Sequence, residues 1–245
     1  MPEIRAVSSA QVVRKLIYVV ADIHGRGDRF HEILDTIGFS EKDRLFILGD
    51  VIDRNPDGIR LLEEIMAADN MKMILGNHEY MMINAIEDPA FPLNDRFTNL
   101  DLWYLNGGAI TEAAFKALPA EKQAEILAFL KQLPLNLELT CGKKRYLLVH
   151  GSPVSQYKSE FCDYIDETEY AVWNRWDPGF DRYDRKTTVI LGHTPTIHFF
   201  PRIPMEVYRK RNLLYIDCGC AYSAEEGGRL ACLCLDTGGV LYSTV

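Results

Sequence analysis

Six short apolar runs in this chain each end near a residue whose side chain can bind a metal ion. The runs are rich in β-branched and large apolar residues, which favour strands. The polar residues at their ends are Asp22, Asp50, Asn77, His150, His193 and Asp217. Helical patterns over 29–37 and 57–68 separate the first three runs, which indicates βαβ units and an α/β fold class. Because the carboxyl ends of parallel strands lie at one edge of a sheet, we expect these side chains to converge there.

A helix-favouring segment lies between the early and late strand patterns. Pro119 suits a first helical turn, and an apolar stripe with a period close to 3.6 follows it at Ile126, Leu127, Leu130 and Leu133. Strand patterns then return, and Asp236-Thr-Gly-Gly between two apolar runs predicts a hairpin turn. The sequence shows no internal repeat and no linker-like tract. We therefore expect residues 1–245 to form a single domain with a helical insertion at about 79–133.

Composition limits the classes of partner. The chain has 245 residues, of which 47% are hydrophobic and 25% charged, and this balance is typical of a packed globular protein. Its net charge of −8 argues against nucleic acid as a partner. No apolar run reaches the ~18 to 20 residues of a membrane-spanning helix, and residues 1–15 lack the apolar core of a signal peptide. We expect a cytoplasmic protein with no membrane partner.

The six cysteines are too few for a disulfide scaffold in a chain of this length. Four form two C-x-C pairs inside strand-like runs, where residues i and i+2 share one face. Buried reduced thiols explain this spacing better than a soft-metal site, because no C-x2-C pair is present. The six are Cys141, Cys162, Cys218, Cys220, Cys232 and Cys234.

The ligand set is mixed in chemistry, since it combines carboxylate, amide and imidazole side chains. Each residue alone is more often a helix cap or a hydrogen-bonded polar residue, so the argument depends on the set. Manganese, iron or zinc suits such nitrogen and oxygen donors, whereas calcium and magnesium prefer oxygen alone. Six ligands exceed the needs of one ion and indicate two divalent ions bridged by one carboxylate. Such a pair can hold a hydroxide for in-line attack on phosphorus, which predicts phosphate ester hydrolysis. The six are Asp22, His24, Asp50, Asn77, His150 and His193.

Three motifs carry a family resemblance, and they follow one another at intervals of 28 and 27 residues. Their pattern, D-x-H-G, G-D-x-x-D-R and G-N-H-E, resembles that of calcineurin-like metallophosphoesterases of the phosphoprotein phosphatase type. In this chain they read Asp22-Ile-His24-Gly25, Gly49-Asp50-Val-Ile-Asp53-Arg54 and Gly76-Asn77-His78-Glu79.

Further segments extend the resemblance over about residues 16–222. The later histidine motifs, His150-Gly and Gly192-His193-Thr-Pro, are similar to two metal-binding segments of the family. Other segments resemble the bacterial and lambda-phage Ser/Thr protein phosphatases: Asn106-Gly107-Gly108 with Thr111, Leu133-Pro134-Leu135 and Trp173-Asn174-Arg175. The resemblance implies two mixed β-sheets stacked face to face and flanked by helices, as in the four-layer metallophosphatase sandwich.

The resemblance also implies a role for each motif residue. One metal ion would be bound by Asp22, His24 and Asp50, and the second by the bridging Asp50 with the remaining ligands, Asn77, His150 and His193. His78 would protonate the leaving oxygen, and Asp53 would orient its imidazole. Arg54 and Arg175 would bind the phosphoryl oxygens, because a guanidinium group matches two oxygens at once. Asp217 is expected to be a hydrogen-bonding residue and not a ligand.

One departure from the family pattern concerns the substrate. Protein phosphatases of this type usually carry Arg before Gly-Asn-His, and here that position is Leu75. Leu at this position is familiar from diadenosine tetraphosphatases, but their pattern often lacks the residue corresponding to Asp53. Asp53 and Trp173-Asn174-Arg175 therefore favour phosphoserine or phosphothreonine in proteins as the substrate. A dinucleoside polyphosphate hydrolase is the first alternative, and a non-catalytic phosphate-binding scaffold is the second.

The sequence leaves several properties open. They are the natural substrate, which could also be a small phosphoester, the metal in the cell, the oligomeric state and any regulator. Substrate choice is expected to depend on the loops over 87–98 and 155–169, for which no general code exists.

Overall fold

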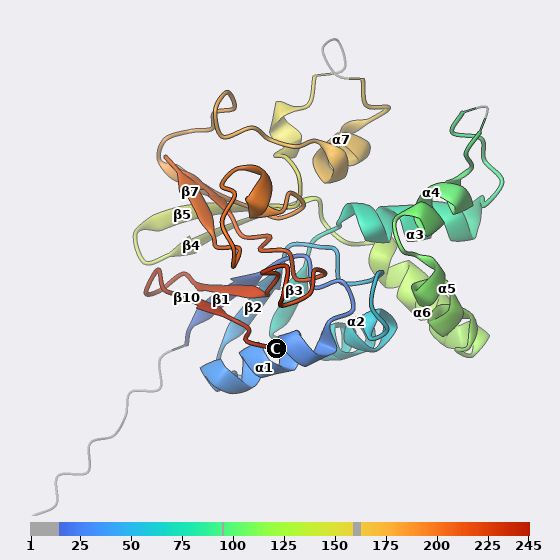
Figure 1. The fold of residues 1–245 in the computed structure, drawn as a ribbon, viewed down its shortest axis with the longest axis horizontal. Coiled ribbons are helices and arrows are strands. Elements are labelled where there is room, and N and C mark those ends of the chain that lie inside the picture. Colours follow the sequence, from blue (N-terminus) through green and yellow to red (C-terminus); the bar gives the residue numbers. More distant parts are fainter. Residues whose placement is uncertain (1–14, 95, 159–162) are drawn as a thin grey trace, which may run out of the picture.

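Two five-stranded mixed sheets lie face to face in the computed structural model, which describes residues 15–94, 96–158 and 163–245 (Figure 1). The first sheet has the strand order β10-β9-β1-β2-β3. Strands β1, β2 and β3 are parallel, and β9 runs antiparallel to both β1 and β10. The strands are β1 (Ile17–Val20), β2 (Arg44–Ile47), β3 (Met71–Met73), β9 (Ala231–Cys234) and β10 (Val240–Tyr242).

The second sheet has the order β4-β5-β6-β8-β7. Its three central strands, β5, β6 and β8, are parallel, and an antiparallel strand flanks them on each side. Each sheet therefore contributes three parallel strands whose carboxyl ends share an edge. The strands are β4 (Asn136–Cys141), β5 (Lys144–Val149), β6 (Thr187–Leu191), β7 (Tyr208–Lys210) and β8 (Leu213–Tyr215).

Side chains of the strands alternate between two apolar layers. Val19 and Phe46 point into the space between the sheets, where they meet Leu148 and Ile190 of the second sheet. Their neighbours point the other way, toward the helices, as Val20 does. Because successive side chains of a strand face opposite sides, strands that are buried on both faces are apolar throughout. This explains the continuous apolar runs of the sequence.

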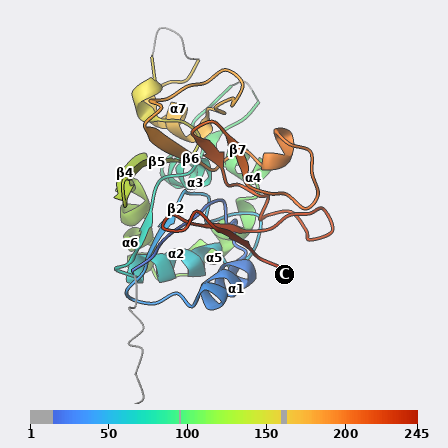
Figure 2. The same ribbon diagram turned by 90° about the vertical axis from the view of Figure 1, so that its left-hand side faces the viewer.

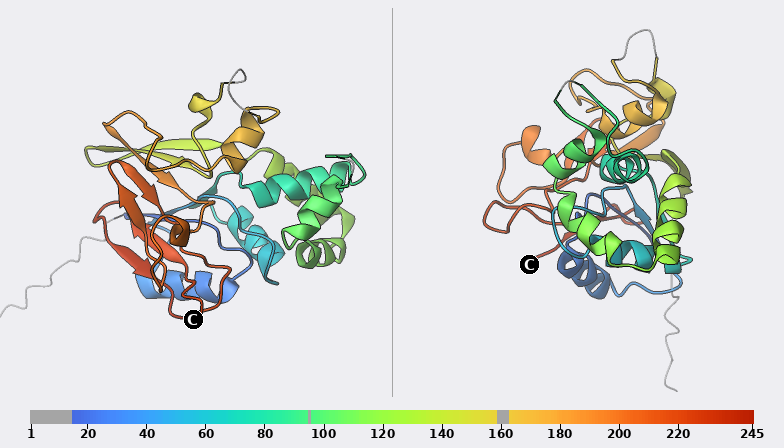
Figure 3. Two further views of the ribbon diagram at one scale, coloured as in Figure 1. Left: turned by 45° about the horizontal axis from the view of Figure 1, so that its top comes forward. Right: turned by 90° about the vertical axis from the view of Figure 1, so that its right-hand side faces the viewer.

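Helices α1 (Gly27–Ile37) and α2 (Gly58–Ala67) cover the outer face of the first sheet (Figure 2). The predicted helices over 29–37 and 57–68 are both present, to within two residues at each end. Four further helices stand together at one side of the sheets (Figure 3). They are α3 (Asn77–Glu87), α4 (Asn99–Leu105), α5 (Ala109–Lys116) and α6 (Ala120–Lys131). In the part of the chain that the structure describes, no helix is long and apolar enough to cross a membrane.

The outer face of the second sheet is covered by shorter elements. Helix α7 (Glu167–Trp173) and two 3-10 turns, η1 (Val154–Gln156) and η2 (Thr196–His198), lie in its connections. Side chains from irregular segments, namely Trp176, Tyr183 and Phe199, pack on this face. The predicted fold class, two mixed sheets flanked by helices, is confirmed, although loops complete the layer over the second sheet.

The structure divides the two C-x-C pairs. Cys232 lies on β9 and Cys234 ends it, and both pack against the same apolar cluster, as a strand requires. Cys218 and Cys220 follow β8 in an irregular segment, where Gly219 has a φ of 69°, and they enter different clusters. The prediction of a strand at this first pair is therefore wrong, because the chain turns after Asp217. The described cysteines are all free thiols, and Cys162 lies outside the described residues.

A buried arginine ties α1 to the end of the chain. The Arg29 guanidinium donates hydrogen bonds to the carbonyl oxygens of Val245 (2.6 Å), Cys220 (2.8 Å) and Tyr222 (3.1 Å). Its side chain is fully buried, and burial lowers its pKa. These bonds join helix α1 to two segments that lie 191 and 216 residues further along the chain.

We expect Arg29→Met to lower the free energy of unfolding by about 2 to 4 kcal/mol, because three carbonyl groups lose a charged donor. Arg26→Met is the matched control, since among the described residues Arg26 forms an ion pair only with the exposed Asp28, and its loss should cost less than about 1 kcal/mol. Urea denaturation followed by circular dichroism measures both. Equal losses in the two variants would show that the Arg29 contacts do not stabilise the fold.

Candidate metal centre

The six predicted ligands lie together at the carboxyl ends of five parallel strands, three from the first sheet and two from the second. The first sheet supplies Asp22 and His24 after β1, Asp50 after β2 and Asn77 after β3; the second supplies His150 after β5 and His193 after β6. All six side chains are buried. The convergence expected from the strand pattern is therefore present, although the loops between strand end and ligand differ in length.

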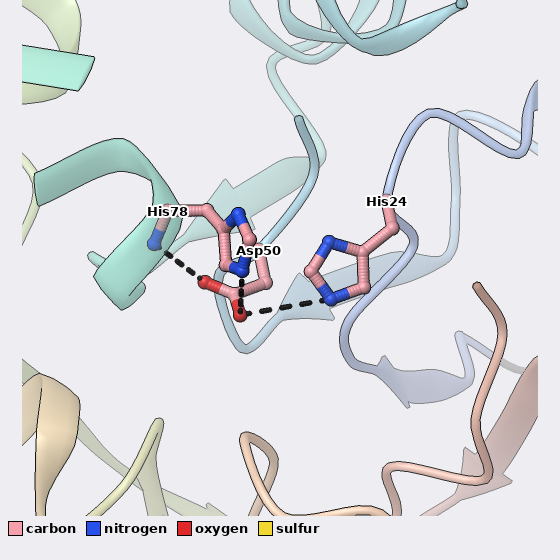
Figure 4. A group of neighbouring side chains, drawn as sticks. All are labelled: His24, Asp50 and His78. Carbon is pink, nitrogen blue, oxygen red and sulfur yellow. Dashed lines mark hydrogen bonds and ion pairs between the residues drawn. The ribbon is translucent and has the colours of Figure 1, made fainter. Parts of the chain in front are cut away.

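The Asp50 carboxylate is the centre of this group. Its Oδ2 lies 3.8 Å from His24 Nε2 and 3.9 Å from His78 Nε2 (Figure 4). Its Oδ1 lies 3.4 Å from His150 Nε2. Within the part of the chain that the structure describes, two sets of side chains have ligand atoms close enough to share a metal ion, and Asp50 belongs to both. They are His24, Asp50 and His78, and Asp50, His150 and His193.

Three of the four imidazoles are anchored to backbone carbonyl oxygens. The Nδ1 atoms of His24 and His150 face the carbonyl oxygens of Ile52 (3.1 Å) and Leu48 (2.6 Å), and His193 Nε2 faces that of Trp173 (3.1 Å). With the proton on the anchored nitrogen, the other ring nitrogen of each histidine is a free donor of an electron pair. This arrangement is the one that orients metal-binding imidazoles in proteins.

The ionisation of the site favours neutral imidazoles around an anion. Burial lowers the pKa of His24, His150 and His193. Burial by itself would raise the pKa of Asp50, but the surrounding imidazoles, with His150 the largest contributor, hold it below its ordinary value. Neutral imidazole and ionised carboxylate are the forms that bind a metal ion.

His78 has different partners from the other three histidines. Its Nδ1 lies 2.7 Å from Asp53 Oδ2, and its Nε2 lies 3.1 Å from an Nη of Arg54. Burial lowers its pKa, but Asp50 and Asp53 outweigh that effect, so the pKa of His78 is raised. A carboxylate partner and a raised pKa suit a group that holds and gives up a proton. His78 therefore differs in chemistry from the three anchored imidazoles, although its distance to Asp50 alone would allow it to be a ligand.

Asn77 and Asp22 are the two predicted ligands that remain. The Asn77 Oδ1 lies 2.9 Å from both His150 Nε2 and His193 Nδ1. The Asp22 carboxylate accepts the backbone N–H of His193 at 2.9 Å, and burial, followed by Asp217 and Asp50, raises its pKa. A cation in the site would favour the ionised form of Asp22.

Asp217 is a buried carboxyl whose charge acts on Asp22, and it has its own hydrogen bond. Its Oδ1 accepts the backbone N–H of Gly219 at 2.9 Å, and burial raises its pKa to about 6. In the described residues it belongs to neither of the two sets of converging ligand atoms. Its surroundings agree with the hydrogen-bonding role that the sequence suggested.

The backbone of the centre is held in unfavourable conformations. Seven described residues other than glycine have a positive φ, and six of them are predicted site residues: Asp22, His24, Asp50, Asp53, Arg54 and His193. Residues other than glycine seldom adopt this region, and such strain concentrates at functional sites, where surrounding contacts hold it. No pattern in the sequence predicted these positive φ values.

Glu79 is a site residue whose role the sequence analysis did not assign. Its carboxylate accepts the backbone N–H groups of Asp50 (2.8 Å) and Val51 (2.9 Å), so it holds the loop that presents Asp50. Burial, together with the charge of Asp50, raises its pKa to about 7. Gly76 lies against this group, because a Cβ there would be 2.2 Å from Asp50 Oδ1. The signal was present in Gly76 and Glu79, which form the start of α3 as an N-cap and its third residue.

The predicted phosphate-binding arginines lie at the exposed side of the centre. Arg54 contacts His78, and the charge of Arg175 lowers the pKa of His150 and His193, which places it near the second set of ligands. Both side chains are exposed. Leu75, by contrast, is 6% exposed and packs in the cluster under the first sheet. Two cations, Arg54 and Arg175, therefore lie at the centre. At the position where related protein phosphatases usually have a third, Leu75 packs in the apolar core.

Known proteins with a similar sequence include a tetraphosphatase and a protein phosphatase. The chain is 32% identical over 167 residues to the symmetrical bis(5'-nucleosyl)-tetraphosphatase of Acidovorax sp. strain JS42, covering 67% of this chain and 54% of that protein. The chain thus spans about half the length of this relative. It is 31% identical to serine/threonine-protein phosphatase 1 of Salmonella typhimurium strain LT2, covering 85% of this chain and 88% of that protein.

Solved structures show the same fold at low sequence identity. A candidate diadenosine tetraphosphatase has a TM-score of 0.61 at 17% identity, covering 94% of both chains. A serine/threonine phosphatase from Saccharomyces cerevisiae has a TM-score of 0.56 at 15% identity, covering 94% of this chain and 80% of that one. The family model for calcineurin-like phosphoesterases matches residues 15–219, which include all six predicted metal ligands. The chain belongs to the calcineurin-like phosphoesterase family, as its motifs suggested.

Proposed function

We propose that this protein is a dinuclear metal-dependent phosphoesterase that hydrolyses phosphate monoesters, with phosphoserine and phosphothreonine in proteins as the first substrate candidates. The observation that carries the proposal is the Asp50 carboxylate shared by two sets of converging ligand atoms. Its second support is His78, which has a carboxylate partner and a raised pKa beside those sets.

The residues present fit two metal ions in number and chemistry. Ligand atoms that each lie about 2.0 to 2.2 Å from a cation are separated from one another by about 3 Å. Separations of 2.9 Å at Asn77 Oδ1 and 3.4 to 3.8 Å at Asp50 are close to this value. In the proposed arrangement Asp22, His24 and Asp50 hold one ion, and Asp50, Asn77, His150 and His193 hold the other. Manganese is the expected ion in vitro, with iron or zinc as alternatives.

The chain's own residues then account for binding and proton transfer. Two bound cations would supply a nucleophile at neutral pH and stabilise charge on the phosphoryl oxygens. Arg54 and Arg175 orient the phosphoryl group from the solvent side. A water oxygen attacks phosphorus, the ester P–O bond opposite to it breaks, and His78 gives a proton to the departing oxygen. Asp53 holds the imidazole ring through Nδ1, so the other ring nitrogen carries that proton.

Two observations favour a phosphoprotein over a dinucleotide as the substrate. The likeness to the Salmonella protein phosphatase extends over most of both chains, whereas that to the Acidovorax tetraphosphatase leaves nearly half of the relative unmatched. Asp53, which the tetraphosphatase pattern often lacks, is present and contacts His78. The second candidate is a dinucleoside polyphosphate hydrolase, and the apolar Leu75 together with the 32% identity supports it.

Parallel assays test the substrate class. The purified protein, stripped by a chelator and restored with manganese, should release phosphate from a phosphothreonine peptide and from p-nitrophenyl phosphate, and the stripped protein should release none. Diadenosine tetraphosphate under the same conditions should be cut more slowly, as measured by formation of ADP. Faster cleavage of the dinucleotide would select the second candidate, and no hydrolysis of any of the three would refute the proposed function.

Asp50→Asn should lose bound metal as well as activity, because one substitution removes the shared anionic ligand of both ions. Metal content by mass spectrometry and p-nitrophenyl phosphate hydrolysis measure the two effects. Asp217→Asn is the matched control, since it neutralises another buried carboxyl, whose charge acts on Asp22, and keeps an oxygen for the Gly219 N–H. This control should retain its metal ions. Full occupancy in Asp50→Asn would contradict a bridging role.

His78→Ala should keep its metal content and lose turnover by ~10² to 10⁴-fold, which is the usual contribution of a general acid. The loss should be smallest for p-nitrophenyl phosphate, whose leaving group is stable without a proton, and larger for phenyl phosphate. Steady-state kinetics on both substrates with metal analysis of the same samples separate the roles. Loss of metal in this variant would make His78 a ligand, as its distance to Asp50 permits.

A further inference from the structure

Residues 103–111, which run from the end of α4 to the start of α5, contact Asp53, the residue that orients His78. Trp103, on α4, is fully buried, and its indole Nε1–H donates a hydrogen bond to Asp53 Oδ2 at 2.9 Å. The same oxygen faces His78 Nδ1 at 2.7 Å. The other carboxylate oxygen, Oδ1, is buried and has no hydrogen-bond partner among the described residues. The orientation of this carboxylate therefore depends on two donors that meet at one oxygen.

The same segment holds the backbone on which Asp53 lies. Asp53 and Arg54 have φ values of 71° and 70°, which are unfavourable for residues with a Cβ. The Asp53 N–H donates to Thr111 Oγ1 at 2.9 Å, and the Arg54 N–H donates to the Gly107 carbonyl at 3.2 Å. Strained residues of this kind persist only when their surroundings hold them. Here the surroundings are residues 103–111, about 50 positions later in the chain.

The two glycines of the segment allow this close approach. Gly107 has a φ of 93°, and a Cβ there would lie 3.0 Å from Arg54 Cγ. A Cβ on Gly108 would lie 2.4 Å from the Trp103 indole ring. The Gly108 N–H also donates to the Trp103 carbonyl at 2.9 Å, which closes the turn after α4. A side chain at Gly108 would therefore clash with the indole, and one at Gly107 would be strained by its positive φ and crowded by Arg54.

We propose that Trp103 is a positioning residue for the catalytic acid, and that its indole N–H keeps the Asp53 carboxylate in register with His78 Nδ1. This inference rests on the proposed function. The Asp53 carboxylate is completely buried, so a lost donor is not replaced by solvent. Without the indole N–H, His78 is the one described side chain that still donates to this carboxylate, and rotation about the Asp53 side chain would let the imidazole turn away from the leaving oxygen. Thr111 and Gly107 hold the backbone at this place, because they accept the N–H groups of Asp53 and Arg54.

Trp103→Phe tests the role of the N–H, because it keeps an aromatic ring and removes the donor. We expect kcat for phenyl phosphate to fall by about 10- to 100-fold, as is usual when a group that orients a functional side chain is lost. The kcat for p-nitrophenyl phosphate should fall by less than about threefold and KM should stay within about twofold, because binding of the phosphoryl group is unchanged. The expected signature is thus a loss in kcat that depends on the leaving group.

Phe115→Leu is the matched control for packing. Phe115 lies on α5, is 2% exposed and belongs to the same apolar cluster as Trp103, but its side chain has no N–H to donate to Asp53. This variant should lower stability and leave both kcat values unchanged. A ring of the same shape without the N–H, β-(3-benzothienyl)alanine incorporated at position 103, should reproduce the loss seen in Trp103→Phe. Full activity in the benzothienyl protein would show that Trp103 acts by packing alone and would overturn the proposal.

A measurement that needs no activity tests the hydrogen bond itself. In ¹⁵N-labelled protein, the indole proton of Trp103 should resonate downfield of the other tryptophan indole protons, because it donates to a carboxylate. Asp53→Asn should move it upfield, and Phe115→Leu should not. An indole resonance that is unaffected by Asp53→Asn would overturn the proposal. If the wild-type protein hydrolyses no phosphoester, the proposed function fails, and this resonance still decides whether Trp103 holds Asp53.

Discussion

The buried Asp50 carboxylate is the interaction on which the rest of this structure depends. An anion away from water is stable only among opposite charges or donors. Here His24, His78 and His150 surround it within 4 Å, and the backbone N–H of His78 donates to it at 3.0 Å. Its own backbone is held by Glu79. These groups come from the loops after β1 and β5 and from the start of α3, so the layers must assemble before the site exists.

The stacking of two sheets explains how so many loops meet at one place. Each sheet has three parallel strands at its centre, and parallel strands end at a common edge. The apolar layer between the sheets, to which Val19 and Ile190 belong, sets the distance between these two edges. His150 and His193 from one sheet thereby reach Asn77 from the other. The core of the fold and the geometry of the centre are consequences of the same packing.

The sequence predicted the ends of the central strands well, and it failed where the chain leaves regular structure. Apolar runs ending near Asp22, Asp50 and Asn77 correctly predicted parallel strands, because a strand buried on both faces has few polar residues. The strand assumed around Cys218 was wrong, since the chain turns at Gly219 and separates its side chain from that of Cys220. The effect of Leu75 was equally hidden, because only packing shows that its side chain points into the core.

By itself the sequence determined the parallel strands β1, β2 and β3, the candidate metal ligands and the family to which the chain belongs, because strand patterns and motifs are local. The tertiary structure decided which histidines are anchored to backbone carbonyls and which one faces a carboxylate. It also decided that Trp103 reaches Asp53 across 50 residues of chain. The physical reason is that a hydrogen bond depends on the distance and direction between two groups, and for groups far apart in sequence these follow from the packing of the whole fold.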